Sequence, residues 1–310
     1  MRSYPHRDKH LQAMTSADLN CVSIKEFGIA DWGGRAFGTT DDPVATLERG
    51  DVVFLPHLGF QPYNRERALF SPDISGSSKN IAFDPATSRL AGSAATGEER
   101  SALADMLARF STDAASLVDH LLPAYGGRIA RGRASFRPVE IADRETSWRK
   151  DDTRLHIDAF PATPVHGRRI LRVFSNVNPA GRPRTWRVGE PFEAIAERFG
   201  AALRPPLGAV TTALHWLRIT KSRRTAYDAL MLQLHDRMKA DDEYQRACAQ
   251  QTIDFPAGST WIAFTDQVSH AAMAGQYQLE QTFMVPVEAM QDASRSPLRI
   301  LEKIKGRRLV

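Results

Sequence analysis

The sequence predicts an antiparallel β core decorated with helices, a mainly β fold of the α+β class. Short runs of β-forming residues stand on both sides of a helical insertion, without the βαβ alternation that builds a parallel sheet. Late in the chain, turn and strand signals also follow each other closely. The predicted strands are residues 51–56, 134–141, 155–160, 169–178, 260–264, 268–273 and 277–287.

Three stretches are predicted to be helical. In residues 98–122 the apolar positions Leu103, Leu107 and Phe110 lie three or four residues apart, and Pro123 ends the pattern. Residues 191–203 form a second amphipathic stretch, and residues 222–250 a longer and more charged one. Between the first strand and the first helix, residues 71–97 are rich in Ser, Gly, Pro and Asn and are predicted to be loop.

Length and composition suit one decorated globular domain. The 310 residues are 42% hydrophobic and 25% charged, which is ordinary for a globular protein that needs no disulfide or metal to hold its core. We expect residues 1–40 to be a polar, partly disordered arm and residues 41–295 to be the single domain. Residues 296–310 form a basic, amphipathic tail.

Charge and cysteine content indicate the cellular compartment and the kind of partner. The two cysteines, Cys21 and Cys248, lack zinc-site spacing, and no apolar run approaches a membrane span of about 20 residues, so we expect a cytoplasmic protein. The formal net charge of +5 favours an anionic partner. By itself the charge does not choose among nucleic acid, anionic lipid and an acidic small molecule.

The most suggestive motif is His156-Ile157-Asp158 in the predicted strand 155–160. Side chains two apart on a strand share a face, so this His and Asp can bind one metal ion. His270, on a late predicted strand, is the best third ligand. Two His and one carboxylate leave open positions on Fe(II). The alternative is a histidine of the core beside a surface carboxylate.

An anionic co-substrate such as a 2-oxoacid needs a cation, preferably an arginine that binds its carboxylate through two hydrogen bonds. Arg172 is the first candidate because it interrupts an apolar strand, where a charge needs a partner. An ion pair with a nearby carboxylate is the alternative explanation. Arg154 and Arg137 are rival anchors, and Asn176 shares the strand face of Arg172.

Weaker candidates surround this set. Asn176 and Asn178 would either orient a ligand or close the strand in a turn of the Asx type. Trp186 and Arg187 would form an aromatic and cationic wall for a sugar, or anchor their loop in the core. Gln278 would contribute from the last strand.

Three segments resemble the 3-deoxy-D-manno-oct-2-ulosonic acid (Kdo) hydroxylases. The first is residues 151–193, which contains DDTRLHIDAFPATP, RILRVFSNVNP and PRTWRVGEPFE. The second is KNIAFD at 79–84, and the third is VSHAAMAGQYQLEQTF at 268–283. The resemblance covers about residues 45–290. It implies a double-stranded β-helix (jelly-roll) core and Fe(II)- and 2-oxoglutarate-dependent hydroxylation with O₂. The family's metal ligands fall on His156, Asp158 and His270.

The resemblance also implies the substrate. This would be Kdo of the lipopolysaccharide inner core, carried on lipid A and hydroxylated at C3, which makes a nucleic-acid partner unexpected. The basic tail would then lie on the anionic cytoplasmic face of the inner membrane, and the alternative is an ordinary solvated helix. Many 2-oxoglutarate oxygenases have an anchoring arginine about ten residues after the distal histidine. Here Glu280 stands at that place, so the anchor is expected among Arg172, Arg154 and Arg137.

Two other functions stay open from the residues alone. One is a cupin-like metal enzyme that acts on a sugar without 2-oxoglutarate. The other is a carbohydrate or lipid A binder that uses the same basic cleft without catalysis. Release of succinate coupled to O₂ uptake separates the first from the oxygenase, and the second predicts that no metal is needed.

Overall fold

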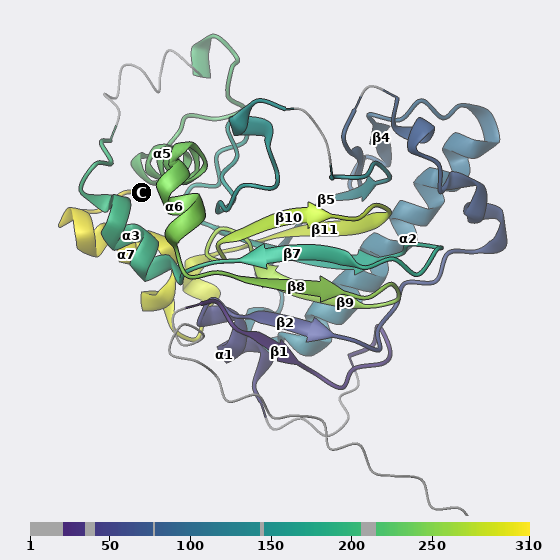
Figure 1. Ribbon diagram of the computed structural model, residues 1–310, viewed down its shortest axis with the longest axis horizontal. Helices are drawn as coiled ribbons and strands as arrows, with labels where there is room; N and C mark the ends of the chain where they lie inside the picture. Colours follow the sequence, from purple (N-terminus) through teal and green to yellow (C-terminus); the bar gives the residue numbers. More distant parts are fainter. Residues whose placement is uncertain (1–20, 35–40, 77, 143–145, 206–214) are drawn as a thin grey trace, which may run out of the picture.

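The computed structural model describes residues 21–34, 41–76, 78–142, 146–205 and 215–310, and its core is a double-stranded β-helix of two sheets (Figure 1). The large sheet has the spatial order β1 (Ile24–Glu26), β2 (Val52–Leu55), β9 (Thr260–Phe264), β6 (Arg169–Asn176), β11 (Gln278–Val285), β5 (Ala130–Arg137), β3 (Ile81–Asp84) and β4 (Arg89–Ala91). The small sheet has the order β10 (His270–Ala274), β7 (Arg184–Val188) and β8 (Gln251–Phe255).

Aromatic side chains fill the space between the two sheets. Phe174 and Trp261 of the large sheet pack against Trp186 and Phe255 of the small one, and the rings of Phe255 and Trp261 stack with centroids 4.1 Å apart. Such pairs stabilise a core beyond their buried area. The packing holds the sheets face to face and makes a firm floor for polar side chains further along the same faces.

One long helix covers the outer face of the large sheet. Helix α2 (Gly97–Leu121) buries Leu103, Leu107 and Phe110 against that face, together with Phe136 of β5. This confirms the helix predicted over residues 98–122. Helix α1 (Pro43–Glu48) packs beside β2.

The other helices gather at one end of the sheets, at the left of Figure 1. They are α3 (Phe192–Gly200), α5 (Ala226–Ala240), α6 (Asp242–Ala247) and α7 (Pro297–Lys305). Short 3-10 turns complete the fold at η2 (Asn64–Leu69), η3 (Pro72–Ser75), η4 (Pro123–Tyr125), η5 (Trp148–Lys150), η6 (Val287–Ala289) and η7 (Ala293–Arg295). Within the described part of the chain, no helix is long and apolar enough to cross a bilayer.

Four sequence predictions need correction. Residues 71–97, predicted to be loop, contain the strands β3 and β4. Residues 155–160 are not a strand: only His156 makes a β-bridge, to His270, after which the Asp158 N–H donates to the Thr265 carbonyl and the chain turns away before Pro161. The helix predicted over 222–250 is two helices, because Asp241 ends α5 and its side chain caps α6. Strand β5 begins at Ala130 and ends before Pro138, which offers no N–H to a ladder.

Both predicted end segments contribute to the fold where the structure describes them. Within residues 1–40, β1 pairs in parallel with β2, whereas residues 1–20 and 35–40 lie outside the described residues. In the tail, α7 buries Leu298 and Leu301 in the same apolar cluster as Phe199 of α3. The division into arm, domain and tail stays a prediction.

Candidate metal centre

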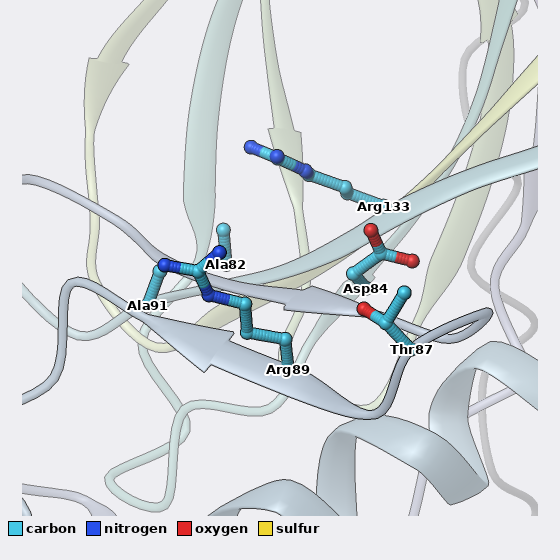
Figure 2. Close-up of a pocket in the computed structure, with 6 residues that line it drawn as sticks. All are labelled: Ala82, Asp84, Thr87, Arg89, Ala91 and Arg133. Carbon is cyan, nitrogen blue, oxygen red and sulfur yellow. The ribbon is translucent and has the colours of Figure 1, made fainter.

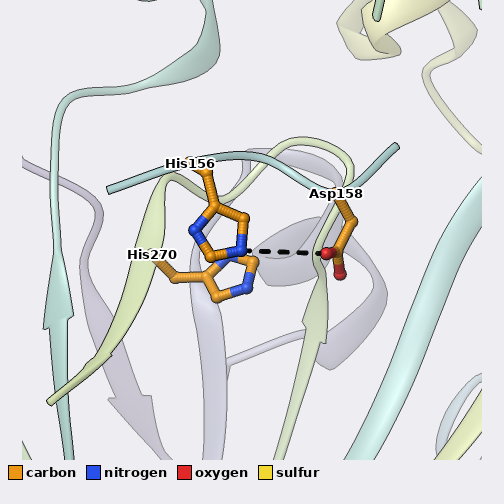
Figure 3. A group of neighbouring side chains, drawn as sticks. All are labelled: His156, Asp158 and His270. Atoms are coloured by element: carbon orange, nitrogen blue, oxygen red, sulfur yellow. Dashed lines mark ion pairs between the residues drawn. The ribbon is translucent and has the colours of Figure 1, made fainter. Parts of the chain in front are cut away.

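Three side chains from distant parts of the sequence meet beside the small sheet. His156 and His270 come from the bridged pair of segments, and Asp158 follows two residues after His156 (Figure 3). Each offers one ligand atom, and these atoms all lie within 4.8 Å of one another. His156 Nε2 is 4.0 Å from Asp158 Oδ1. The spacing suits three ligands around one ion.

Backbone hydrogen bonds fix both imidazole rings. His156 Nδ1 lies 2.7 Å from the Arg154 carbonyl oxygen, and His270 Nδ1 lies 2.8 Å from the Val268 carbonyl oxygen. A carbonyl can only accept, so each Nδ1 carries the proton and each Nε2 keeps a lone pair. Trp186 stacks on the His270 ring with centroids 5.0 Å apart, which fixes its orientation further.

The protonation states suit a divalent metal. Burial lowers the pKa of His270, and burial and His270 together lower the pKa of His156 well below its ordinary value. Burial would raise the pKa of Asp158, but Arg172 and the two histidines outweigh it and lower that pKa. Two neutral imidazoles and one carboxylate are therefore ready to bind, and they match the facial ligand set of non-heme Fe(II) sites. The residues fit an iron ion.

An arginine–glutamate network lies next to these ligands. Arg172 Nη1 is 2.9 Å from Glu280 Oε1, and Arg172 Nη2 is 3.2 Å from Asp158 Oδ2. Arg137 donates from Nε and Nη2 to Glu280 Oε2, at 3.1 and 2.8 Å. Glu280 thus lies between two guanidinium groups. An arginine at position 280 would be repelled by both of them.

Several buried polar atoms around the centre lack a hydrogen-bond partner within the described residues. Besides Asp158 Oδ2, which forms an ion pair with Arg172, they are Arg172 Nε, Arg184 Nε, Trp186 Nε1 and Gln278 Oε1. Orphaned polar atoms are costly in a protein interior unless a ligand or water satisfies them. Four of them around one hollow indicate a binding site for a polar molecule.

These groups line a hollow of about 190 Å³. Its wall includes all three candidate ligands and Arg137, Arg172, Trp186 and Gln278 from the sequence analysis. It also includes residues that the sequence analysis did not offer as candidates: Lys79, Asn80, Asp152, Phe174, Arg184 and Ala272. Arg184 lies two residues before Trp186 on β7, so the period of two in a strand was the available signal for it.

The remaining candidates lie outside this wall. Arg154 pairs with Asp242 of α6, and Arg187 donates to the Thr153 carbonyl at 2.9 Å. The Asn176 amide donates to two backbone carbonyls, while its oxygen accepts from the Asn178 N–H at 3.0 Å. Both asparagines therefore serve to close the turn after β6, the second of the two roles considered for them.

A wider hollow of about 730 Å³ lies on the large sheet at β3, β4 and β5 (Figure 2). Ala82 and Ala91 form part of its floor, and Arg89 and Arg133 stand around it. Arg133 lies four residues before Arg137 on β5. Since side chains an even number apart share a face, the wide hollow and the metal centre open on the same side of the large sheet.

A double-stranded β-helix with a candidate His–Asp–His centre is the arrangement found in non-heme Fe(II)- and 2-oxoglutarate-dependent oxygenases. The comparisons identify the family within that class. A sequence model described as 3-deoxy-D-manno-oct-2-ulosonic acid (Kdo) hydroxylase matches residues 35–308. The chain therefore belongs to the Kdo hydroxylase family.

Three solved structures of the Kdo hydroxylase KdoO, a non-heme Fe(II) alphaketoglutarate-dependent dioxygenase, are similar to this chain. They are its complexes with alphaketoglutarate and Fe(III), with cobalt(II), and with succinate and Fe(III). Each is 44% identical over 93% of this chain and 97% of the KdoO chain, with TM-scores of 0.89, 0.89 and 0.88. A comparison with curated protein sequences found no match.

Proposed function

We propose that this protein is an Fe(II)- and 2-oxoglutarate-dependent hydroxylase that acts on C3 of Kdo. The observation that carries the proposal is the convergence of His156, Asp158 and His270 in a member of the Kdo hydroxylase family. The reaction would use O₂ and convert 2-oxoglutarate to succinate and CO₂. In a 3-deoxy sugar C3 carries hydrogen but no hydroxyl, so it is the position open to such a reaction.

We assign the metal to His156, Asp158 and His270. These three residues would hold the ion, and two histidines with one carboxylate are a ligand set that leaves positions open for a co-substrate and O₂. Bound iron would supply the oxidising chemistry. The protein supplies a carboxylate that stays ionised and two imidazoles whose Nδ1 atoms remain protonated on backbone carbonyls. Trp186 stacks on the His270 ring, and Trp186 and Phe174 both line the hollow beside the centre.

We assign the far carboxylate of 2-oxoglutarate to Arg172 and Arg137, and we add Arg184 to them. Arg172 and Arg184 each have a buried Nε without a partner among the described residues. The Glu280 carboxylate pairs with the guanidinium groups of both Arg137 and Arg172, and it offsets the repulsion between them before the ligand enters. An arriving carboxylate would then share these arginines with Glu280, which gives directional binding.

We propose that the Kdo is carried on lipid A, as in the inner core of lipopolysaccharide. Support comes from the large sheet: the wide hollow is lined by Arg89 and Arg133, together with one carboxylate, Asp84. A substrate with several carboxylates and phosphates has charge complementary to these arginines. Such a substrate would require the enzyme to work at the cytoplasmic face of the inner membrane.

The test uses the full chain with Fe(II), ascorbate, 2-oxoglutarate and Kdo-containing lipid A. We expect the sugar to gain the mass of one oxygen and one succinate to form for each product. A His270→Ala variant should lose at least about a thousandfold in rate, because iron would keep only two ligands. His120→Ala, on the exposed face of α2, is the matched control and should keep its activity.

Other outcomes separate the alternatives. Succinate without oxidised sugar would keep the oxygenase and reject Kdo as substrate. A changed sugar without succinate would favour the cupin-like enzyme. Sugar binding that persists in His270→Ala, with no iron bound by the wild type, would favour a binding protein.

A further inference from the structure

Exposed apolar side chains gather in one short segment before α5. Of the six large apolar side chains that are exposed in the described part of the chain, three are Trp216, Leu217 and Ile219. Their exposed fractions are 85%, 63% and 53%. Single exposed apolar residues are common, but three within four positions form a patch that marks a contact surface.

The patch stands on an ordered base. Thr220 is buried, and the Lys221 N–H donates to the Ala162 carbonyl at 2.9 Å. Arg224 donates to the Pro161 carbonyl, and α5 begins next with a capping box between Thr225 and Asp228. In Figure 1 the segment forms the short turn at the top left, which projects past α5. The apolar tip is therefore presented outward by a base that the fold anchors.

Cations lie within and beside the patch in the sequence. From Arg198 to Tyr227 the sequence contains six Lys and Arg residues and no Asp or Glu. Arg218 and Lys221, beside the apolar tip, are exposed and form no ion pair with any described residue. Exposed tryptophan and leucine interleaved with cations is the composition of segments that lie in the interface of an anionic bilayer.

The amphipathic tail does not offer such a surface. Leu298, Leu301 and Leu309 are buried in the apolar cluster of the helical end, so the apolar face of α7 is already covered. Lys305 donates to the carbonyls of Gly200 and Leu203. The tail can add charge to a membrane contact, but it has little apolar area left to insert.

We propose that Trp216, Leu217 and Ile219, with Arg218 and Lys221, form a docking surface for an anionic lipid bilayer. The location fits an enzyme whose substrate is lipid-borne, and in this respect the inference rests on the proposed function. The base of the patch contacts Pro161 and Ala162, three and four residues after Asp158. That span is at most about 14 Å of chain, so docking would bring the metal centre close to the lipid surface.

Vesicle binding by the full chain tests the proposal without using activity. The probe is a vesicle of phosphatidylcholine with about one-third phosphatidylglycerol, compared with pure phosphatidylcholine. We expect binding to the anionic vesicles only. Trp216→Ser/Leu217→Ser/Ile219→Ser should weaken it on the order of 100-fold. Arg218→Gln/Lys221→Gln should weaken it about 30-fold, since each cation near a charged surface adds about fivefold.

The matched control is Ile304→Ser/Val310→Ser, which removes exposed apolar side chains from the tail. It should bind like the wild type. Trp216 emission should also shift to the blue on anionic vesicles, and the shift should vanish in Trp216→Phe. Circular dichroism on every variant guards against loss of folding.

Three results would overturn the proposal: no binding to anionic vesicles, equal binding of the triple variant, or loss of binding in the tail control. Self-association that disappears in the triple variant, seen by sedimentation, would assign the patch to a second copy instead. With activity added, the triple variant should turn over a soluble Kdo glycoside normally and vesicle-borne Kdo-lipid A poorly. If neither substrate is oxidised by the wild type, the proposed function fails while the binding result stands.

Discussion

Arg169 and Arg172 lie three residues apart on β6, point to opposite faces of the strand, and have opposite environments. Arg169 is fully buried: it donates to Asp266 from Nε and Nη2, at 2.7 and 3.3 Å, and to Gln267 at 2.6 Å, and its guanidinium lies 3.9 Å from the centroid of the Phe264 ring. Its partners are all within the protein, so its charge serves the fold.

Arg172 divides its charge between two carboxylates and still has an unpartnered Nε at the wall of a hollow. A buried arginine with complete partners stabilises the fold, whereas one with incomplete partners beside a cavity is available to a ligand. Burial alone would not separate them, since both arginines are buried.

The largest expected effect is on stability, from Asp266→Ala. The change would leave the Arg169 charge buried without its carboxylate, at a cost of about 3–5 kcal/mol in the free energy of unfolding. Urea denaturation measures it. In Arg169→Met/Asp266→Leu, which removes both charges, most of this loss should be recovered. A loss below about 1 kcal/mol in Asp266→Ala would show that Arg169 does not depend on this pair.

The next effect is on co-substrate binding, from Arg172→Met. Loss of a charged hydrogen bond to a carboxylate should raise the KM for 2-oxoglutarate about 10- to 100-fold. The stability change should be smaller than in Asp266→Ala, because Glu280 keeps Arg137 as a partner. Succinate formation against 2-oxoglutarate concentration measures it. Arg154→Met is the matched control, and an equal rise in its KM would return Arg154 to the list of anchors.

The sequence was sufficient for the parts of the fold that depend on local patterns. The α2 helix followed from apolar spacing, and β6, β9 and β11 from runs of β-formers between turns. The core class and the candidate ligands His156, Asp158 and His270 were also predictable, because His156 and Asp158 form a short local motif and a separate segment that resembles the family contains His270.

Other features depend on contacts between distant residues, which a single sequence does not display. The segment around His156 looks like a strand, yet it crosses the end of the sheet and makes one bridge. In the sequence, nothing distinguishes one charged residue near a strand from another. Only the packing decides which of them have all their partners within the protein, as Arg169 does with Asp266, and which do not, as with Arg172 beside Glu280. For the same reason Lys79 was missed, whereas Arg184 shares a strand face with Trp186 and could have been found from that spacing.

The smallest expected effect comes from Glu280→Gln and has a defined pH dependence. Burial raises the pKa of Glu280, but Arg137 and Arg172 outweigh it and hold that pKa below its ordinary value. A carboxyl with a lower pKa in the folded than in the unfolded state adds stability above its unfolded pKa, near 4.3. That stability is lost as the pH falls through the folded value.

At about pH 7 the wild type should therefore be more stable than Glu280→Gln by about 1–3 kcal/mol, and the gap should close below about pH 4. Urea denaturation with a chelator present measures it without a contribution from bound metal. An unchanged gap at acid pH would mean that shape, not charge, is what Glu280 contributes between the two arginines. If the stability difference disappears at acid pH, the charge of Glu280 is what holds Arg137 and Arg172 in place. Glu280 then belongs, like Arg172, to a set of charged groups that a ligand can still share.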